Sequence, residues 1–185
     1  MTIIIIIVII VFILAMFIGG YNSFIHLKNS VEEAFSTMDV YLKRRYDLIP
    51  NLVETVKGYT TYESGTLEKI VEARSRAMSG GSVQERTENE NVLSGALKSL
   101  FALAENYPQL KADTNFLNLQ QELSGIETDI AQSRKYYNGV VRAMNTKVEM
   151  FPSNIIAAIF NFNRYPFFIV DDEAERQNVR VDFKN

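Results

Sequence analysis

A run of apolar residues near the beginning of the sequence decides the fold class: residues 3–18 read IIIIIVIIVFILAMFI. Met1 to Ile18 contains seventeen apolar residues and Thr2, and no charged side chain occurs before Lys28. About 20 helical residues cross a hydrocarbon core of roughly 30 Å. We therefore expect residues 1–21 to form a transmembrane anchor.

Two other interpretations of this run are weaker. A signal peptide begins with Lys or Arg and ends at a small-residue cleavage site, whereas this run follows Met1-Thr2 and no such site comes after it. A core helix that is apolar on every side needs a large domain around it, and about 160 residues remain. The sequence favours a retained single-pass helix.

The basic residues predict how the chain is oriented, because Lys and Arg near the end of a span favour the cytoplasmic side. Lys28 and the run Lys43-Arg44-Arg45 follow the apolar run, and no side-chain charge precedes it. We expect a short N-terminus outside and a cytoplasmic C-terminal body.

Apolar residues with helical spacing continue beyond the anchor. They recur every three, four or seven positions, which places them on one helix face: Leu27, Val31, Ala34, Met38, Leu42, Ile49, Leu52, Val56 and Tyr59. Pro50 lies inside this pattern, removes one backbone hydrogen bond and crowds the Tyr46 carbonyl. We expect a kink or a short break at Pro50, not the end of the helix, with the stripe resuming from Leu67 to Ala77.

Two more helices follow the loop at residues 79–82, which reads SGGS. The first covers Gln84 to Glu105. The second is capped by Asp113 or Thr114, reaches roughly 50 Å and ends at Phe151-Pro152.

Strand patterns are nearly absent, so the predicted fold class is all-α. The expected architecture is a single N-terminal transmembrane helix followed by an antiparallel, up-and-down bundle of long, coiled-coil-like helices. We assign residues 22–170 to the bundle and residues 171–185 to an acidic C-terminal tail.

The composition excludes several classes of chemistry. The chain has no Cys and one His, which removes disulfides, Cys-based metal sites, His-rich zinc sites and most acid-base triads. The formal net charge of -3 gives no basic surface for nucleic acid. We expect neither an enzyme nor a cofactor.

Some charged residues fall on the apolar helix faces. Burying single charges is costly, so we expect them to form structural ion pairs between helices. The residues concerned are Arg45, Glu63, Arg74, Glu127 and Arg134. The specific hypothesis is that Arg45 or Arg74 pairs with Glu127 and that Arg134 pairs with Glu63.

The segment from Asn154 to Val170 is rich in aromatic residues. Five of them lie within nine positions, namely Phe160, Phe162, Tyr165, Phe167 and Phe168. One interpretation is a short helix and an extended tail that cover the open end of the bundle. The other is an exposed interface for the membrane, a second copy or a partner.

Several strings together closely resemble the signature of the LemA family, and the resemblance covers about residues 20 to 170. They are YLKRRYDLIPNLVETVKGY over 41–59, Glu72-Ala73-Arg74, YPQLK over 107–111, FLNLQQEL over 116–123 and Phe151-Pro152. The resemblance implies a bacterial cell-membrane protein with one N-terminal helix, an antiparallel helical bundle and no established enzymatic activity.

These observations lead to one preferred function and one alternative. The preferred function is a membrane-anchored scaffold that self-associates and organises the bacterial inner membrane, with the lipid bilayer and further copies of itself as partners. Association would use the bundle faces and the aromatic segment, because Ala15 and Gly19 form the one small-xxx-small pair of the anchor. The alternative is an adaptor that docks another membrane protein, for example a protease.

Overall fold

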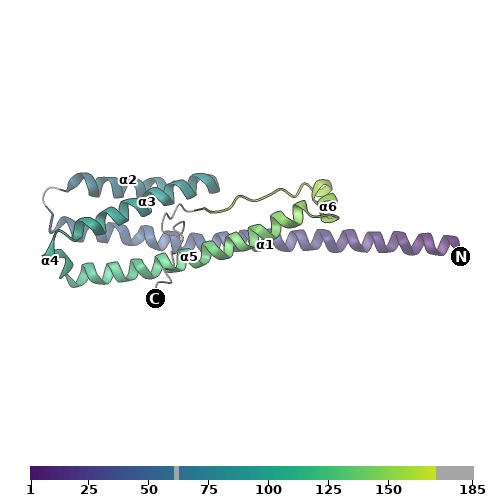
Figure 1. The fold of residues 1–185 in the computed structure, drawn as a ribbon, viewed down its shortest axis with the longest axis horizontal. Helices are drawn as coiled ribbons and strands as arrows, with labels where there is room; N and C mark the ends of the chain where they lie inside the picture. Colours follow the sequence, from purple (N-terminus) through teal and green to yellow (C-terminus); the bar gives the residue numbers. More distant parts are fainter. Residues whose placement is uncertain (61–62, 170–185) are drawn as a thin grey trace, which may run out of the picture.

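The computed structural model describes residues 1–60 and 63–169. Helices are the regular structure of this part, and no strand occurs among the residues that it describes. They are α1 (Thr2–Lys57), α2 (Ser64–Met78), α3 (Val83–Ala104), α4 (Pro108–Lys111), α5 (Thr114–Glu149) and α6 (Ser153–Phe160) (Figure 1). The predicted all-α class is confirmed. The tail predicted over residues 171–185 lies outside the described residues.

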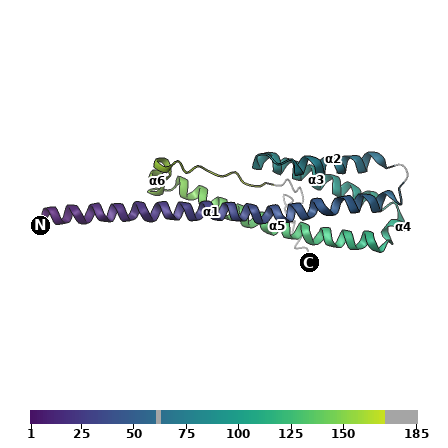
Figure 2. The same cartoon turned by 180° about the vertical axis from the view of Figure 1, so that it is seen from behind.

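The first helix joins the apolar run to the bundle without interruption. α1 has 56 residues, so it is roughly 84 Å long, and its N-terminal part extends alone beyond the other helices (Figure 2). Its most apolar 18-residue window has a mean hydropathy of 3.4 and is 0% buried in the protein. α1 is therefore long and apolar enough to cross a membrane, and the same rigid element forms the bundle's central helix.

The helices alternate in direction, as the up-and-down prediction requires. α2 returns along α1, α3 runs away from the N-terminal end again, and α5 returns over most of the length of the bundle (Figure 1). α1 packs along α5, and α2 packs along α3 and against α1. The core side chains lie where the sequence stripe placed them, for example Ala34, Met38, Ile49, Ile70 and Val141.

The helix does not end at Pro50, as predicted, and the alternative of a short break is excluded, because α1 continues through the proline to Lys57. Proline has no N–H, so the Tyr46 carbonyl lacks its usual partner four residues later. The Arg74 Nε of α2 donates to this carbonyl at 2.7 Å. A side chain from the next helix thus replaces the missing backbone bond and lets α1 pass through the proline.

The first bundle helix ends later than Pro50, at Lys57, where the Gly58 amide still bonds to the carbonyls of Glu54 and Thr55. The stripe predicted from Leu27 to Ala77 is therefore divided between two antiparallel helices. Leu67, Ile70 and Ala77 remain buried, because α2 folds back and places them against α1 and α3. Spacing alone could not distinguish the two arrangements, since a stripe keeps its period on either side of a turn.

Side-chain caps begin the two longest helices that follow. Ser82 accepts from the Glu85 amide, and the Glu85 carboxylate accepts from the Ser82 amide, which makes a reciprocal capping box for α3. Asp113, one of the two residues predicted to cap α5, accepts from the Phe116 amide at 2.8 Å. The predicted starts of both helices are correct to within one residue.

Candidate functional site

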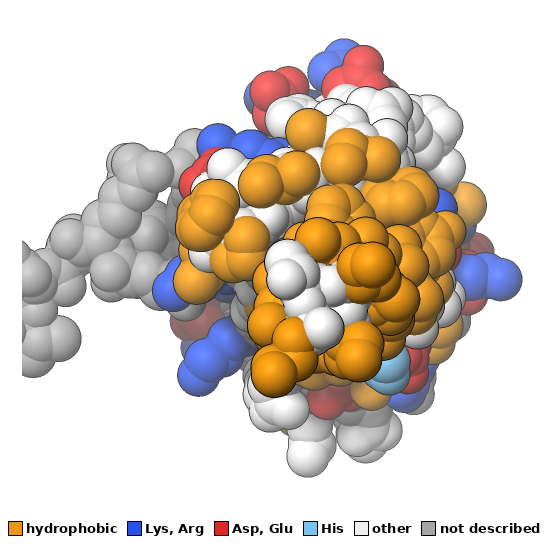
Figure 3. Space-filling view, turned by 90° about the vertical axis from the view of Figure 1, so that its right-hand side faces the viewer, with side chains coloured by type: hydrophobic (Ala, Val, Ile, Leu, Met, Phe, Trp, Pro, Cys, Tyr) orange, Lys and Arg blue, Asp and Glu red, His pale blue; other side chains and the backbone are white. Residues whose placement is uncertain are grey.

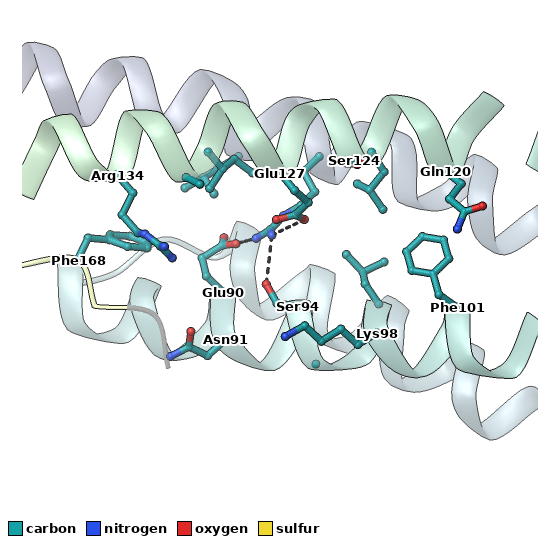
Figure 4. A pocket seen from close by; sticks show the side chains of 17 residues that line it. Glu90, Asn91, Ser94, Lys98, Phe101, Gln120, Ser124, Glu127, Arg134 and Phe168 are labelled. Atoms are coloured by element: carbon teal, nitrogen blue, oxygen red, sulfur yellow. Dashed lines mark hydrogen bonds and ion pairs between the residues drawn. The ribbon is translucent and has the colours of Figure 1, made fainter. Parts of the chain in front are cut away.

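A groove lined by both charged and apolar side chains lies between α3 and α5, which do not pack closely on each other (Figure 4). Its volume is about 560 Å³. Leu42 and Arg45 of α1 form its floor. Phe101 and Gln120 lie at one end of the groove, and Arg134 and Phe168 lie at the other (Figure 4).

Arg45 is the centre of this groove. Its side chain is 2% exposed, and the whole residue is buried among apolar neighbours of α1. Nη1 donates to Glu127 Oε1 at 2.8 Å and to Ser94 Oγ at 3.3 Å, while Nη2 forms an ion pair with Glu90. A single guanidinium from α1 therefore bridges α3 and α5, the two helices that do not pack closely on each other.

Tyr46 extends the network to α2. Its hydroxyl donates to Glu90 and lies 3.4 Å from the Ala77 carbonyl. Burial raises the pKa of the Tyr46 hydroxyl above its ordinary value, against the Arg45 charge, which lowers it. The hydroxyl thus stays protonated at neutral pH and satisfies the second oxygen of the buried Glu90 carboxylate.

Half of the specific ion-pair hypothesis is correct. Arg45 does pair with Glu127, as predicted, and Arg74 instead donates to the Tyr46 carbonyl. The predicted Arg134–Glu63 pair is wrong. Glu63 lies at the end where α1 joins α2 and its Oε1 lies 3.4 Å from the Tyr107 hydroxyl, whereas Arg134 lies twenty residues into α5, about 30 Å along that helix.

The aromatic segment covers the bundle, as the first interpretation proposed. After α6 the chain is extended, and Phe168 becomes fully buried at the end of the groove. Phe162, Tyr165 and Phe167 are partly buried against the core, and Phe160 remains 47% exposed.

Two asparagines of α5 hold this extended segment in place. Asn145 exchanges two hydrogen bonds with the backbone of Tyr165, at 2.8 and 2.9 Å, and Asn138 does the same with Phe168, at 2.9 and 3.0 Å. Seven helical residues rise about 10 Å, which equals three residues of extended chain. The spacing of the asparagines therefore matches the spacing of the backbone groups that they bind.

The described residues offer no obvious reaction centre. Across residues 1–60 and 63–169, no group of three or more His, Cys, Asp or Glu side chains is placed to hold a metal ion. Arg45 pairs with both carboxylates of the groove, those of Glu90 and Glu127, and Tyr46 also donates to Glu90. This arrangement suits a fixed ionic connection between helices.

A known protein family matches most of the sequence. The model of the LemA family matches residues 34–183, which is most of the chain and includes every residue of the Arg45 network. The chain belongs to the LemA family. The resemblance noted in the sequence is thereby confirmed.

This LemA-family chain also matches curated proteins over most of its length. It is 28% identical to Protein LemA of Metamycoplasma hominis, over 89% of this chain and 75% of that protein. It is 24% identical to Magnetosome protein MamQ 2 of Paramagnetospirillum magneticum, over 84% and 66% of the two chains. It is 21% identical to Magnetosome protein MamQ of Magnetospirillum gryphiswaldense, over 80% and 64%. The chain spans three quarters of the first relative and about two thirds of the magnetosome proteins.

Three residues that matter in this LemA-family structure were not singled out as site residues from the sequence. Glu90 lies in a polar run, QERTENEN, but it also stands three residues before Leu93 and seven before Leu97, so helical spacing to these buried leucines was the available signal for its burial. Asn138 and Asn145 are seven residues apart on the α5 face that also carries Tyr137 and Val141, and this spacing was the available signal.

Proposed function

We propose that this membrane-associated LemA-family protein is a non-catalytic helical scaffold that binds further copies of itself through the bundle. The observation that carries the proposal is a second groove, of about 590 Å³, between α1 and α5. Its lining includes Leu27 and Val140 together with the small residues Gly139 and Ala143.

The shape of this groove suits another helix. Gly139 and Ala143 are one turn apart on α5 and exposed, so the backbone of a second helix can approach closely there. Tyr136, on the same face, is 56% exposed and offers a large amphipathic ring. An apolar floor with an aromatic edge is the composition that interfaces favour at their centres.

The anchor supports association between copies. α1 is continuous from the apolar run to Lys57, so every copy holds the groove at the same distance along α1 from its apolar run. Leu27 lies only about 10 Å along α1 from Gly20. Copies confined to one membrane would therefore present the same surface to one another at high local concentration, which favours symmetric self-association.

The names of the relatives agree with a role without catalysis. Protein LemA and Magnetosome protein MamQ are names that state no reaction. Two of the relatives are named as magnetosome proteins.

We further propose the bacterial inner membrane as the location, with the bundle in the cytoplasm. The support is the position of Lys28 and of Lys43-Arg44 after the apolar run. Added protease should digest the bundle in inverted membrane vesicles and leave it intact in spheroplasts. The reverse pattern would overturn this orientation.

The experiment for self-association measures the mass of the full-length protein in lipid nanodiscs. Ala143→Arg places a long cation in the groove, and Ala102→Arg makes the same change at an exposed position of α3. We expect oligomers from the unchanged protein and from Ala102→Arg, and smaller species from Ala143→Arg. Monomers throughout would overturn the proposal, and a second polypeptide retained at fixed ratio would favour the adaptor.

A further inference from the structure

The short helix α6 lies against α1 at the end of the apolar run. A Cβ added at Gly20 would overlap the terminal methyl of Ile156, so the two helices approach closely there. The ring of Tyr21 lies 4.7 Å from that of Phe160 and 5.8 Å from that of Phe162. Gly20 is seventeen residues beyond Ile3, about 26 Å along α1, which is close to the thickness of a bilayer core.

The outer surface of α6 and of the turn before it is apolar and exposed. Residues 150–163 contain no charged side chain. Exposed asparagines also occur in this segment. Its large apolar side chains that are 46% to 78% exposed are those of Met150, Phe151, Ile155, Ile159 and Phe160. We call these five residues the apolar foot. Such a concentration of exposed large apolar side chains marks an interaction surface.

Charged residues bound the foot on the side of the bundle. Glu149 and Arg164 directly precede and follow the uncharged segment and pair with each other at 2.9 Å. Lys147 lies over the ring of Phe24, 5.2 Å from its centre, and contacts Ser23. The change from charged to apolar side chains thus occurs at one level of the molecule on both α1 and α5.

The foot is continuous with the surface of the candidate span. Seen along α1 from its N-terminal end, hydrophobic side chains fill the centre of the view and extend to one side, and the charged side chains lie at the periphery (Figure 3). The helices α2, α3 and α4 do not extend to the part of α1 beside α6, because they lie at the other end of the bundle (Figure 1).

We propose that the apolar foot inserts into the interfacial layer of the same bilayer that α1 spans. An apolar segment that lies beside a membrane-spanning helix, at the level where that helix leaves the hydrocarbon, gains free energy by moving its side chains out of water into the acyl boundary. The Glu149–Arg164 pair stays in the headgroup and water layer. This inference concerns lipid contact and stands independently of self-association.

The second contact has a mechanical consequence. A bundle held by one membrane-spanning helix can rotate about the axis of that helix. A second membrane contact on one side of the helix fixes both the rotation and the tilt of the bundle relative to the membrane. The groove between α1 and α5 then takes one direction relative to the membrane plane. Insertion on one side of the anchor also places extra volume in one leaflet.

Fluorescence quenching at single engineered cysteines tests the proposal, because the chain has no cysteine of its own. The positions are Ile159→Cys in the foot, Val92→Cys on α3 and Leu14→Cys in the span, which are 60%, 53% and 56% exposed. Each full-length variant is labelled with an environment-sensitive dye and reconstituted in phosphatidylcholine–phosphatidylglycerol vesicles at high lipid-to-protein ratio. Lipids with brominated chains and aqueous iodide are the two quenchers.

We expect the label at residue 159 to behave like the label at residue 14, with at least threefold stronger quenching by brominated lipid than at residue 92 and correspondingly weaker quenching by iodide. If residue 159 responds to iodide as residue 92 does while residue 14 responds to lipid, the anchor holds and the foot is overturned. If residue 159 is shielded from both quenchers, protein covers it, and the foot is overturned in favour of a protein interface.

Discussion

The two ends of the bundle are held together by different means. At the groove, Arg45 joins α3 and α5 through ion pairs with Glu90 and Glu127. Toward the anchor, Asn138 and Asn145 hold an extended segment by neutral hydrogen bonds to its backbone. Ion pairs hold the helices together at the groove, and hydrogen bonds from asparagine side chains hold the aromatic segment nearer the anchor.

The difference reflects what each end must connect. Long helices have no free backbone groups in their interiors, so only side chains can join them, and a guanidinium reaches two partners at once. An extended segment has free N–H and C=O groups that must be satisfied when buried, and an asparagine can satisfy one of each. The groove therefore fixes helix register, and the asparagines fix how far the aromatic segment returns along α5.

The largest effect is expected at the buried charge. Arg45→Met leaves the Glu90 carboxylate, 3% exposed, without its cation, which costs about 3–5 kcal/mol of stability. Arg76→Met is the matched control, because it removes the exposed pair with Glu72 and costs at most about 0.5 kcal/mol. Thermal unfolding of the full-length proteins, followed by circular dichroism in one detergent, compares them.

Adding Glu90→Gln to Arg45→Met removes the uncompensated charge and keeps an acceptor for Tyr46. We expect the double variant to recover part of the loss. Equal melting temperatures for Arg45→Met and Arg76→Met would show that the ionic connection does not stabilise the bundle.

A smaller effect is expected where the asparagines act. Asn145→Ala leaves the N–H and C=O of Tyr165 without their partners, at a cost of about 2–3 kcal/mol. Asn163→Ala is the control, since Asn163 is exposed and bonds only to the nearby Asn161 carbonyl. Hydrogen exchange at the Tyr165 amide should accelerate strongly in the first variant. Unchanged exchange there would contradict the assigned role.

The hydrogen bond from Arg74 to the Tyr46 carbonyl predicts that the effects on stability of substitutions at positions 74 and 50 depend on each other. Arg74→Met leaves the Tyr46 carbonyl without a donor and should cost about 1–2 kcal/mol. In a Pro50→Ala background the new amide of residue 50 reaches that carbonyl, so the same change should cost less than half as much. Equal costs in both backgrounds would mean that Arg74 acts in some other way.

The smallest effect concerns the cap of α5. The Phe116 amide, and then the Tyr59 hydroxyl, hold the pKa of Asp113 below its ordinary value of 3.8. The folded state therefore binds a proton at Asp113 more weakly than the unfolded state does. The stability that the charged Asp113 carboxylate contributes is complete above about pH 4 and is lost as the pH falls through the lowered pKa. Asp113→Asn keeps a cap but does not titrate.

Melting temperatures of the unchanged protein and Asp113→Asn should therefore differ most near pH 6 and converge toward pH 3. A difference that stays constant across this range would show that the charge of Asp113 makes no pH-dependent contribution.

The sequence predicted the helices and the role of Arg45 well, because both depend on periodicity. An arginine at the step between Leu42 and Ile49 must face the interior, and an acidic residue on another helix must compensate it. The choice of Glu127 from α5 followed, since it interrupts the apolar face of that helix in the same way.

Three features of the structure were not predicted from the sequence. The position of the turn between α1 and α2 depends on tertiary packing, because the stripe continues across it. The passage of α1 through Pro50 depends on Arg74, a residue of the next helix. Glu90 shares the buried face of α3 with Leu93 and Leu97, but the polar residues on either side of it hid this position in the sequence.

We propose that this LemA-family protein assembles with itself on the membrane. Native mass spectrometry of the full-length protein released directly from bacterial membrane vesicles tests it without a change of detergent. We expect masses at integer multiples of the single chain, with lipid bound and no second polypeptide. A species that contains one copy together with a different membrane protein at fixed ratio, or one copy alone, would contradict it.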